Sequence, residues 1–104
     1  MDAGTAVAGC GPAFAYLFLD ALASGGEKCG LPREKALTYA TQMLLGAASL
    51  AQKTGTPPAQ LRDAVCSPGG STIEGVRTLQ AECFCEAVEH AVQASYRRNQ
   101  ELRK

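Results

Sequence analysis

The chain has 104 residues, and its 10 Lys and Arg residues balance 10 Asp and Glu residues. This length provides for one domain with a modest core. A neutral chain exerts no long-range attraction on nucleic acid or on an anionic membrane, so the composition excludes partners that are recognised through charge alone. No uninterrupted apolar run has the length that crosses a bilayer, and we expect no membrane partner.

The cysteines indicate the redox environment. Their number is odd, they lack C-x-x-C spacing, and no histidine lies near enough to complete a zinc site. The five are Cys10, Cys29, Cys66, Cys83 and Cys85. Since no secretory signal precedes them, we expect buried or idle thiols in a reducing compartment. We expect the cytoplasm, with the mitochondrion as the alternative.

The chain opens with Met1-Asp2-Ala3-Gly4 and soon enters a helical pattern. A domain that is cut at its boundary and given a start methionine has this appearance. We therefore expect that the front of a longer protein is absent from this sequence.

The first predicted helix begins with Gly11 as its N-cap and Pro12 in its first turn, and it stops at Gly30. Apolar residues recur in it at helical spacing, at Phe14, Leu17, Phe18, Ala21 and Leu22. Its other faces are apolar as well, so we expect a second protomer to cover them in a dimer. The alternative is that the rest of the bundle folds over this helix.

A second helix is predicted from Pro32 to Thr54, with Gly55 as a left-handed cap. Gly46 and the alanines around it make one face of this helix thin. Another helix can approach closely there, within the bundle or across a subunit interface, although ordinary core packing also explains small residues.

Three further helices complete the pattern. Thr56 is expected to cap a short helix from Pro57 to about Cys66. The next helix carries Ile73, and the last begins at about Phe84. Since no segment alternates as a strand does, we predict an all-α bundle of five helices in this 104-residue chain.

The segment between the third and fourth predicted helices is the best candidate for a binding site. It reads S-P-G-G-S-T-I-E from Ser67 to Glu74. Ser71 and Glu74 have the spacing of a capping box, and the preceding Gly69 and Gly70 allow a ligand to approach the backbone. Free amides at a helix N-terminus bind a carboxylate or phosphate. The alternative is a loop that caps the helix and binds nothing.

Other patterns predict less. Gly9-Cys10-Gly11 begins like a dinucleotide-binding turn, but Phe14 stands at the third glycine position and no strand precedes it. His90, near two glutamates, is better explained as a solvated side chain than as a metal ligand. We predict no metal site and no nucleophilic triad.

The order of short segments along nearly the whole chain resembles the C-terminal domain of pyrroline-5-carboxylate reductase. The segments are G-C-G-P-A-F, D-A-L, G-L-P-R, L-G-A-A, P-A-Q-L-R-D and S-P-G-G-S-T-I. Those between Pro58 and Ile73 are the most specific. The resemblance implies a helical fold like the C-terminal domain of 6-phosphogluconate dehydrogenase, in an intertwined homodimer that can assemble further.

The resemblance also implies roles for particular residues. The substrate carboxylate would bind Ser67, Gly69, Gly70, Ser71 and Thr72. Thr72 would be the catalytic residue, nearest the ring nitrogen of pyrroline-5-carboxylate, while NADP or NAD in its reduced form would supply hydride to give proline. Gly11 and Pro12 would contact that cofactor, which a preceding Rossmann domain would mainly bind. Because this domain is absent from the 104 residues, we expect the isolated chain to be a dimer without activity.

Three departures from the family pattern stand out. Cys10 replaces a serine, and Ser71 stands where threonine or alanine is usual. Glu82-Cys83 replaces two glycines, so we expect the last two helices to join without a sharp turn. Two alternatives remain: a helical oligomerisation module without catalysis, and a related dehydrogenase acting on hydroxy acids or imines.

Overall fold

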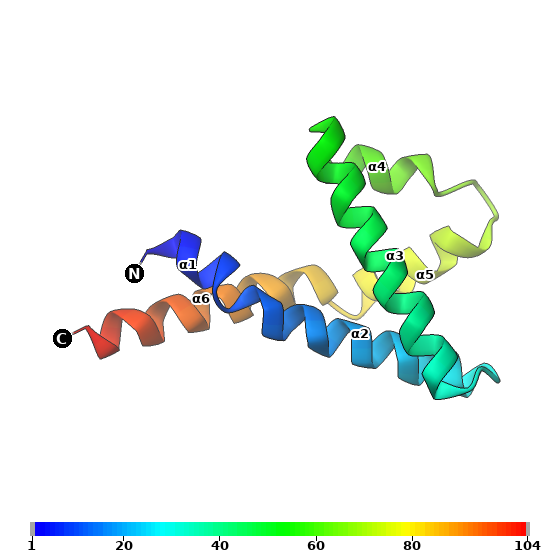
Figure 1. Cartoon of the computed structure of the whole chain (residues 1–104). Coiled ribbons are helices and arrows are strands. Elements are labelled where there is room, and N and C mark those ends of the chain that lie inside the picture. The colour runs from blue at the N-terminus through cyan, green and yellow to red at the C-terminus, as the bar shows by residue number, and fades with distance from the viewer. Residues whose placement is uncertain (1, 104) are drawn as a thin grey trace. The chain divides into compact units, whose positions relative to one another are not determined.

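The computed structural model describes residues 2–103, and every helix or strand assigned within them is an α-helix. The helices are α1 (Ala3–Ala8), α2 (Gly11–Lys28), α3 (Arg33–Thr54), α4 (Pro58–Ala64), α5 (Ser71–Ala81) and α6 (Phe84–Leu102) (Figure 1). The predicted all-α class is confirmed, and the five predicted helices correspond to α2 through α6.

Helix α1 is an addition to the predicted set. Asp2 is its N-cap, and the Asp2 carboxylate accepts a hydrogen bond of 3.1 Å from the backbone N–H of Thr5. This bond lowers the pKa of Asp2, because it stabilises the ionised carboxylate. A single cap is enough to start a helix of this length where α6 packs against it.

The internal contacts divide the chain into two units. One unit is continuous and spans residues 14–64, which include most of α2, all of α3 and α4. The other joins residues 2–13 to residues 65–103, and within it α6 contacts both α1 and α5. Figure 1 shows α1 beside the C-terminal half of α6.

In the continuous unit, α2 and α3 form a helical hairpin with a defined turn. Gly30 takes a φ of +106°, the N–H of Leu31 bonds the carbonyl of Gly26 at 2.9 Å, and the N–H of Gly30 bonds that of Glu27 at 3.0 Å. These two bonds are the Schellman motif, which satisfies the last carbonyls of α2. The predicted stop at Gly30 is confirmed.

Arg33 ties the start of α3 back to α2. Its guanidinium pairs with Glu27 at 2.8 Å and also with Asp20, and it lies 3.5 Å from the hydroxyl of Ser24. The hydrogen bonds to Glu27 and Asp20 raise the pKa of Arg33, so the side chain stays charged throughout the accessible pH range. All of these groups are exposed, and the pairs orient the hairpin more than they stabilise it.

The fully covered part of the chain is made of small side chains. Among residues 2–103 the buried apolar residues are Ala6 at 0 %, Ala23 at 0 %, Ala36 at 4 % and Ala40 at 8 % relative exposure. No large apolar side chain reaches that degree of burial, and α2 and α3 together expose tyrosine, leucine and methionine side chains. The chain by itself therefore covers little of its apolar surface.

The joint between α5 and α6 contradicts our expectation of a smooth junction. Helix α5 ends at Ala81, and Cys83 takes a left-handed conformation with φ +62° before α6 begins. It is the one non-glycine residue with positive φ in the described range. The chain turns sharply here although Glu82-Cys83 replaces the two glycines of the family pattern, because α5 and α6 pack against each other. Cys83 adopts the strained left-handed conformation that the turn requires.

Two of the predicted helix starts shift by a residue or two. Helix α4 begins after Pro57, whose carbonyl accepts the first helical bonds from Gln60 and Leu61, so the expected cap at Thr56 is wrong. Gly11 is the first residue of α2 and not its N-cap, because the N–H of Ala13 bonds the carbonyl of Cys10. In contrast, Gly55 caps α3 in the left-handed conformation, as predicted.

Two neighbouring glycines of α2 test the hairpin packing. A Cβ at Gly26 would lie 3.0 Å from the Cβ of Ala36, whereas a Cβ at Gly25 would meet nothing within 4 Å. We expect Gly26→Ala to lower the free energy of unfolding by about 1 kcal/mol, because the backbone of α3 must move. Gly25→Ala should raise it by about 0.5–1 kcal/mol through helix propensity. Urea unfolding at one protein concentration measures both, and equal effects would contradict the close approach.

The α5–α6 joint gives a second test. We expect Cys83→Gly to raise the free energy of unfolding by about 0.5–1 kcal/mol, because glycine adopts positive φ without strain. Cys83→Ala is the control, since it removes the thiol and retains the strain, and it should leave stability nearly unchanged. If alanine stabilises as much as glycine, the thiol and not the backbone is responsible.

Candidate functional site

The segment predicted as a binding site begins with a tight turn. The N–H of Gly70 donates to the carbonyl of Ser67 at 3.0 Å, and Gly69 has a φ of +75°. With Pro68 and Gly69 as its central residues, this is a type II turn. Of the two glycines only Gly69 has a positive φ, because Gly70 has φ −83°, but a Cβ at Gly70 would lie 3.2 Å from the Ser67 carbonyl oxygen.

The turn delivers the chain into α5 without a side-chain cap. The N-cap is Gly70, which has no side chain, and Ser71 is already the first helical residue. The predicted capping box is therefore wrong, and Glu74 instead lies 3.8 Å from Arg77 in an exposed pair. The physical reason is register: the type II turn ends one residue earlier than a serine cap requires. The first amides of α5 are left available to an external acceptor.

Side-chain hydroxyls add donors at the same place. Thr38, Thr54 and Thr78 each donate to a backbone carbonyl four residues earlier in their own helix. The hydroxyls of Ser71 and Thr72 make no hydrogen bond of this kind within residues 2–103. The turn thus places main-chain amides and uncommitted hydroxyls together at the positive end of a helix dipole.

The predicted substrate-binding residues are brought together by this turn, but a single chain leaves them open. Ser67, Gly69, Ser71 and Thr72 are exposed, and Gly70 is half-buried. An anion held only by exposed amides competes with water, so selective binding needs a second surface to cover the turn. The candidate site is geometrically defined but incomplete in one copy of the chain.

The other predicted site residues lie elsewhere in the sequence and fold. Gly11 and Pro12 form the first turn of α2, and Pro12 is exposed. Nothing in the described residues tests their predicted contact with a cofactor. His90 is exposed on α6, and no group of three or more His, Cys, Asp or Glu side chains in the part described is placed to hold a metal ion.

The cysteines are more accessible than expected. Cys29, Cys83 and Cys85 are exposed, while Cys10 and Cys66 are half-buried, and all five are free thiols. Of the two expected states, burial is wrong for Cys29, Cys83 and Cys85, because residues 2–103 enclose too little apolar volume, while the expectation of idle thiols stays a prediction.

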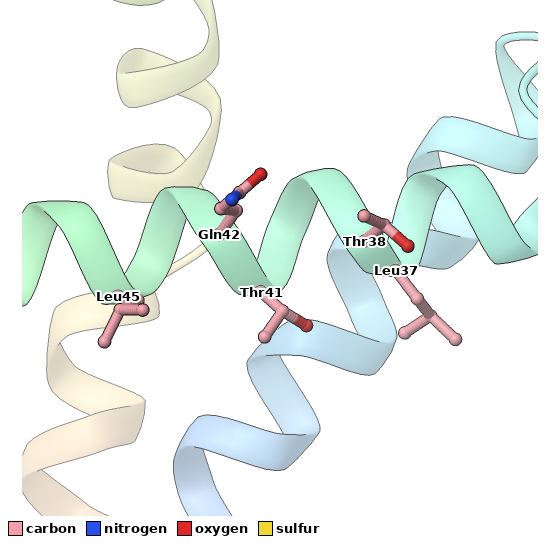
Figure 2. Close-up of a pocket in the computed structure, with 5 residues that line it drawn as sticks. All are labelled: Leu37, Thr38, Thr41, Gln42 and Leu45. Carbon is pink, nitrogen blue, oxygen red and sulfur yellow. The ribbon is translucent and has the colours of Figure 1, made fainter.

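Helix α3 carries an open hollow that sequence reasoning did not identify. Its lining residues are Leu37, Thr38, Thr41, Gln42 and Leu45, and Figure 2 shows Leu37, Thr41 and Leu45 on one side of the helix. None of them is charged, and none belongs to the predicted site. The hollow offers apolar contact and does not attract a carboxylate.

The N-terminal helical segment is more apolar than our reading of the sequence allowed. Residues Ala3–Lys28, which comprise α1 and α2, have the length and composition of a helix that can cross a membrane, and an 18-residue window within them has a mean hydropathy of 1.5. A helix whose apolar faces contact another protein chain meets the same criterion. The match is therefore weak as an indication of a membrane.

Comparison with known proteins defines the class to which this fold and turn belong. Residues 1–102 match the family described as pyrroline-5-carboxylate reductase dimerisation. The chain is thus an all-helical dimerisation domain, and it belongs to the pyrroline-5-carboxylate reductase dimerisation family. Membership in such a family indicates that copies of the chain associate.

The individual relatives agree with this assignment. The chain is 51 % identical over its whole length to pyrroline-5-carboxylate reductase of Synechocystis, and covers 39 % of that protein. It is 48 % identical to the Arabidopsis thaliana enzyme, where 97 % of this chain aligns with 37 % of the relative. A crystal structure of Plasmodium falciparum pyrroline carboxylate reductase with NADP bound superimposes with a TM-score of 0.89 at 39 % identity, over 94 % of this chain and 40 % of that one. The chain spans about two fifths of the length of these relatives.

The left-handed glycine of the turn gives a test of the site geometry. Gly69→Ala places a side chain at φ +75°, so we expect it to lower the free energy of unfolding by about 1–2 kcal/mol. Gly75→Ala is the matched control, because Gly75 is helical and a Cβ there meets nothing within 4 Å. That control should be neutral or stabilising in urea unfolding. A neutral Gly69→Ala would show that the turn does not require positive φ.

Proposed function

We propose that this chain provides the dimer contact and the substrate carboxylate site of a pyrroline-5-carboxylate reductase, the enzyme that reduces 1-pyrroline-5-carboxylate to L-proline. The observation that carries the proposal is the start of α5, where a type II turn leads into a helix without a side-chain cap. The relatives that share about half of its residues carry that enzyme's name.

The proposed binding step follows from the direction of the amides. A substrate carboxylate at the start of α5 accepts hydrogen bonds from main-chain N–H groups of Ser71 and Thr72, and the dipole of the helix favours its negative charge. Gly69 and Gly70 keep side chains away from the approach path. The hydroxyls of Ser67 and Ser71 complete the set of donors around the anion.

Thr72 is the residue that we assign to the reacting end of the substrate. With the carboxylate held by the turn, its hydroxyl lies nearest the ring nitrogen and hydrogen-bonds it as the C=N bond is reduced. The reaction requires a reduced nicotinamide, NADPH or NADH, which supplies hydride to the C=N carbon. Residues 2–103 contain no strand–turn–helix unit for its pyrophosphate, so the part proposed for this chain is to bind and orient the imino acid.

A second copy of the chain is the proposed cover for the site. The turn is exposed in one copy, and only alanine side chains are buried among the described apolar residues. A homodimer buries the exposed apolar side chains of α2 and α3 and lowers the dielectric around the bound carboxylate. The same observation favours a second candidate function, a helical oligomerisation module that associates but binds no imino acid.

Calorimetry with L-proline, combined with analytical ultracentrifugation, separates the two candidates. We expect a dimer that binds proline, and a loss of about tenfold in affinity for Thr72→Ala, because one hydrogen bond to the ligand is removed. Thr78→Ala is the control, since the Thr78 hydroxyl bonds the carbonyl of Glu74 one turn earlier. A stable dimer without proline binding would favour the oligomerisation module, and a monomer would contradict both.

A further inference from the structure

The joint between α5 and α6 carries two cysteines that are separated by one residue. Cys83 is the N-cap of α6, Phe84 is the first helical residue, and Cys85 follows in the first turn. Both thiols are exposed and free, and Cys83 makes no side-chain capping hydrogen bond. Both residues belong to the unit that includes 65–103, so their spacing is fixed within one unit. The joint therefore presents two uncommitted thiols close together along the chain.

The backbone conformation of Cys83 is a second observation that points to a function for its thiol. A φ of +62° is strained for a residue with a side chain, and glycine would adopt it without that strain. The exposed side chain fills no core, so packing does not account for a cysteine here. Strained residues other than glycine cluster at functional sites and ligand clamps. The conformation thus indicates a role of the thiol itself, in binding a ligand or in forming a disulfide.

The separation of the two residues selects between these roles. Across one helical residue, here Phe84, the Cα–Cα distance is about 5.4 Å from the radius and rise of a helix. With the left-handed φ and ψ of Cys83, the two Cβ atoms point apart and lie about 7 Å from each other. A disulfide needs Cβ atoms about 3.5–4.5 Å apart, so the first turn of α6 would have to unwind. The folded chain disfavours a direct bond between the two sulfurs.

A metal ion between the sulfurs fits this separation. Metal–sulfur bonds are about 2.3 Å long, so sulfurs on opposite sides of one ion are about 4.6 Å apart, and the two Cβ–Sγ bonds extend this reach to the Cβ atoms. Within residues 2–103 no group of three or more His, Cys, Asp or Glu side chains is placed to hold an ion. Zn²⁺, which takes four ligands, is therefore a poor fit. Cu(I) is a soft cation that prefers thiolates and accepts two of them in a line.

We propose that Cys83 and Cys85 form a two-thiolate binding site for Cu(I) at the start of α6. Each thiol releases its proton when it binds, so the complex of one Cu⁺ with two thiolates carries a charge of −1. The positive end of the α6 dipole favours the thiolates and this net charge. The carboxylates of Glu82 and Glu86 oppose it weakly, because they are exposed and solvent screens them. The site lies beyond the far end of α5 from the proposed anion site and is independent of the proposed function.

Anaerobic competition for Cu(I) against a chromogenic Cu(I) chelator tests the site. We expect one ion per chain, and a loss of at least about a hundredfold in affinity for Cys83→Gly or Cys85→Ser, because one thiolate alone cannot hold the ion in a line. Cys83→Gly also relieves the backbone strain, so the fold is not at risk. Cys29→Ser is the matched control, since Cys29 is an exposed thiol at the other end of the chain's joints, after α2, and it should leave the affinity unchanged.

X-ray absorption at the copper edge gives an independent readout of the ligands. We expect two sulfur neighbours and no nitrogen or oxygen neighbour. Three or more sulfur neighbours, or one ion for every two chains, would show that other thiols hold the ion and would overturn the site. The site is equally overturned if the wild-type chain takes no Cu(I) from the chelator, or if Cys29→Ser weakens binding as much as Cys85→Ser. Proline binding and self-association, measured on the same samples, are unaffected by either result and test the proposed function separately.

Discussion

The close approach of α2 and α3 at their shared turn depends on the small side chains at that point. Gly26 and Ala36 bring the two backbones so close that a single added Cβ would lie 3.0 Å from its neighbour. Only four alanines are buried among the described apolar residues, and the larger apolar side chains are half-buried or exposed. Much apolar surface is therefore open to contact with a second molecule.

The uncovered apolar surface links association between copies of the chain to the proposed binding of an anion. We propose the start of α5 as an anion site made from main-chain amides, and such a site has a fixed shape but no side chains of its own to exclude water. In the proposed function, a surface from a second copy would supply the exclusion that the single chain lacks. Exposed apolar side chains for association and a main-chain site for the anion are consistent with a sequence that has hardly any charged candidate residues.

Features that depend on local rules were predictable from sequence. Gly30 and Gly55 both end helices with positive φ, and residues 67–70 form the turn that their composition indicates. The failures arose where packing or register decides the outcome. Contact between α5 and α6 sets the conformation of Cys83, and the turn register gives the N-cap to Gly70 instead of Ser71. The exposure of the site in one chain was also beyond sequence reasoning, because burial depends on where every other helix lies.

The two contact units differ in the length of chain that separates the segments in contact. Residues 14–64 are continuous, and the α2–α3 hairpin within them closes through a turn of four residues, Cys29 to Pro32. The other unit requires residues 2–13 to meet residues 65–103, which encloses a loop of about fifty residues. Short-range contacts form faster than long-range ones. The hairpin is therefore expected to fold first. Its exposed apolar side chains are then accessible before the chain ends have come together, so that encounter with another molecule competes in time with the completion of the fold.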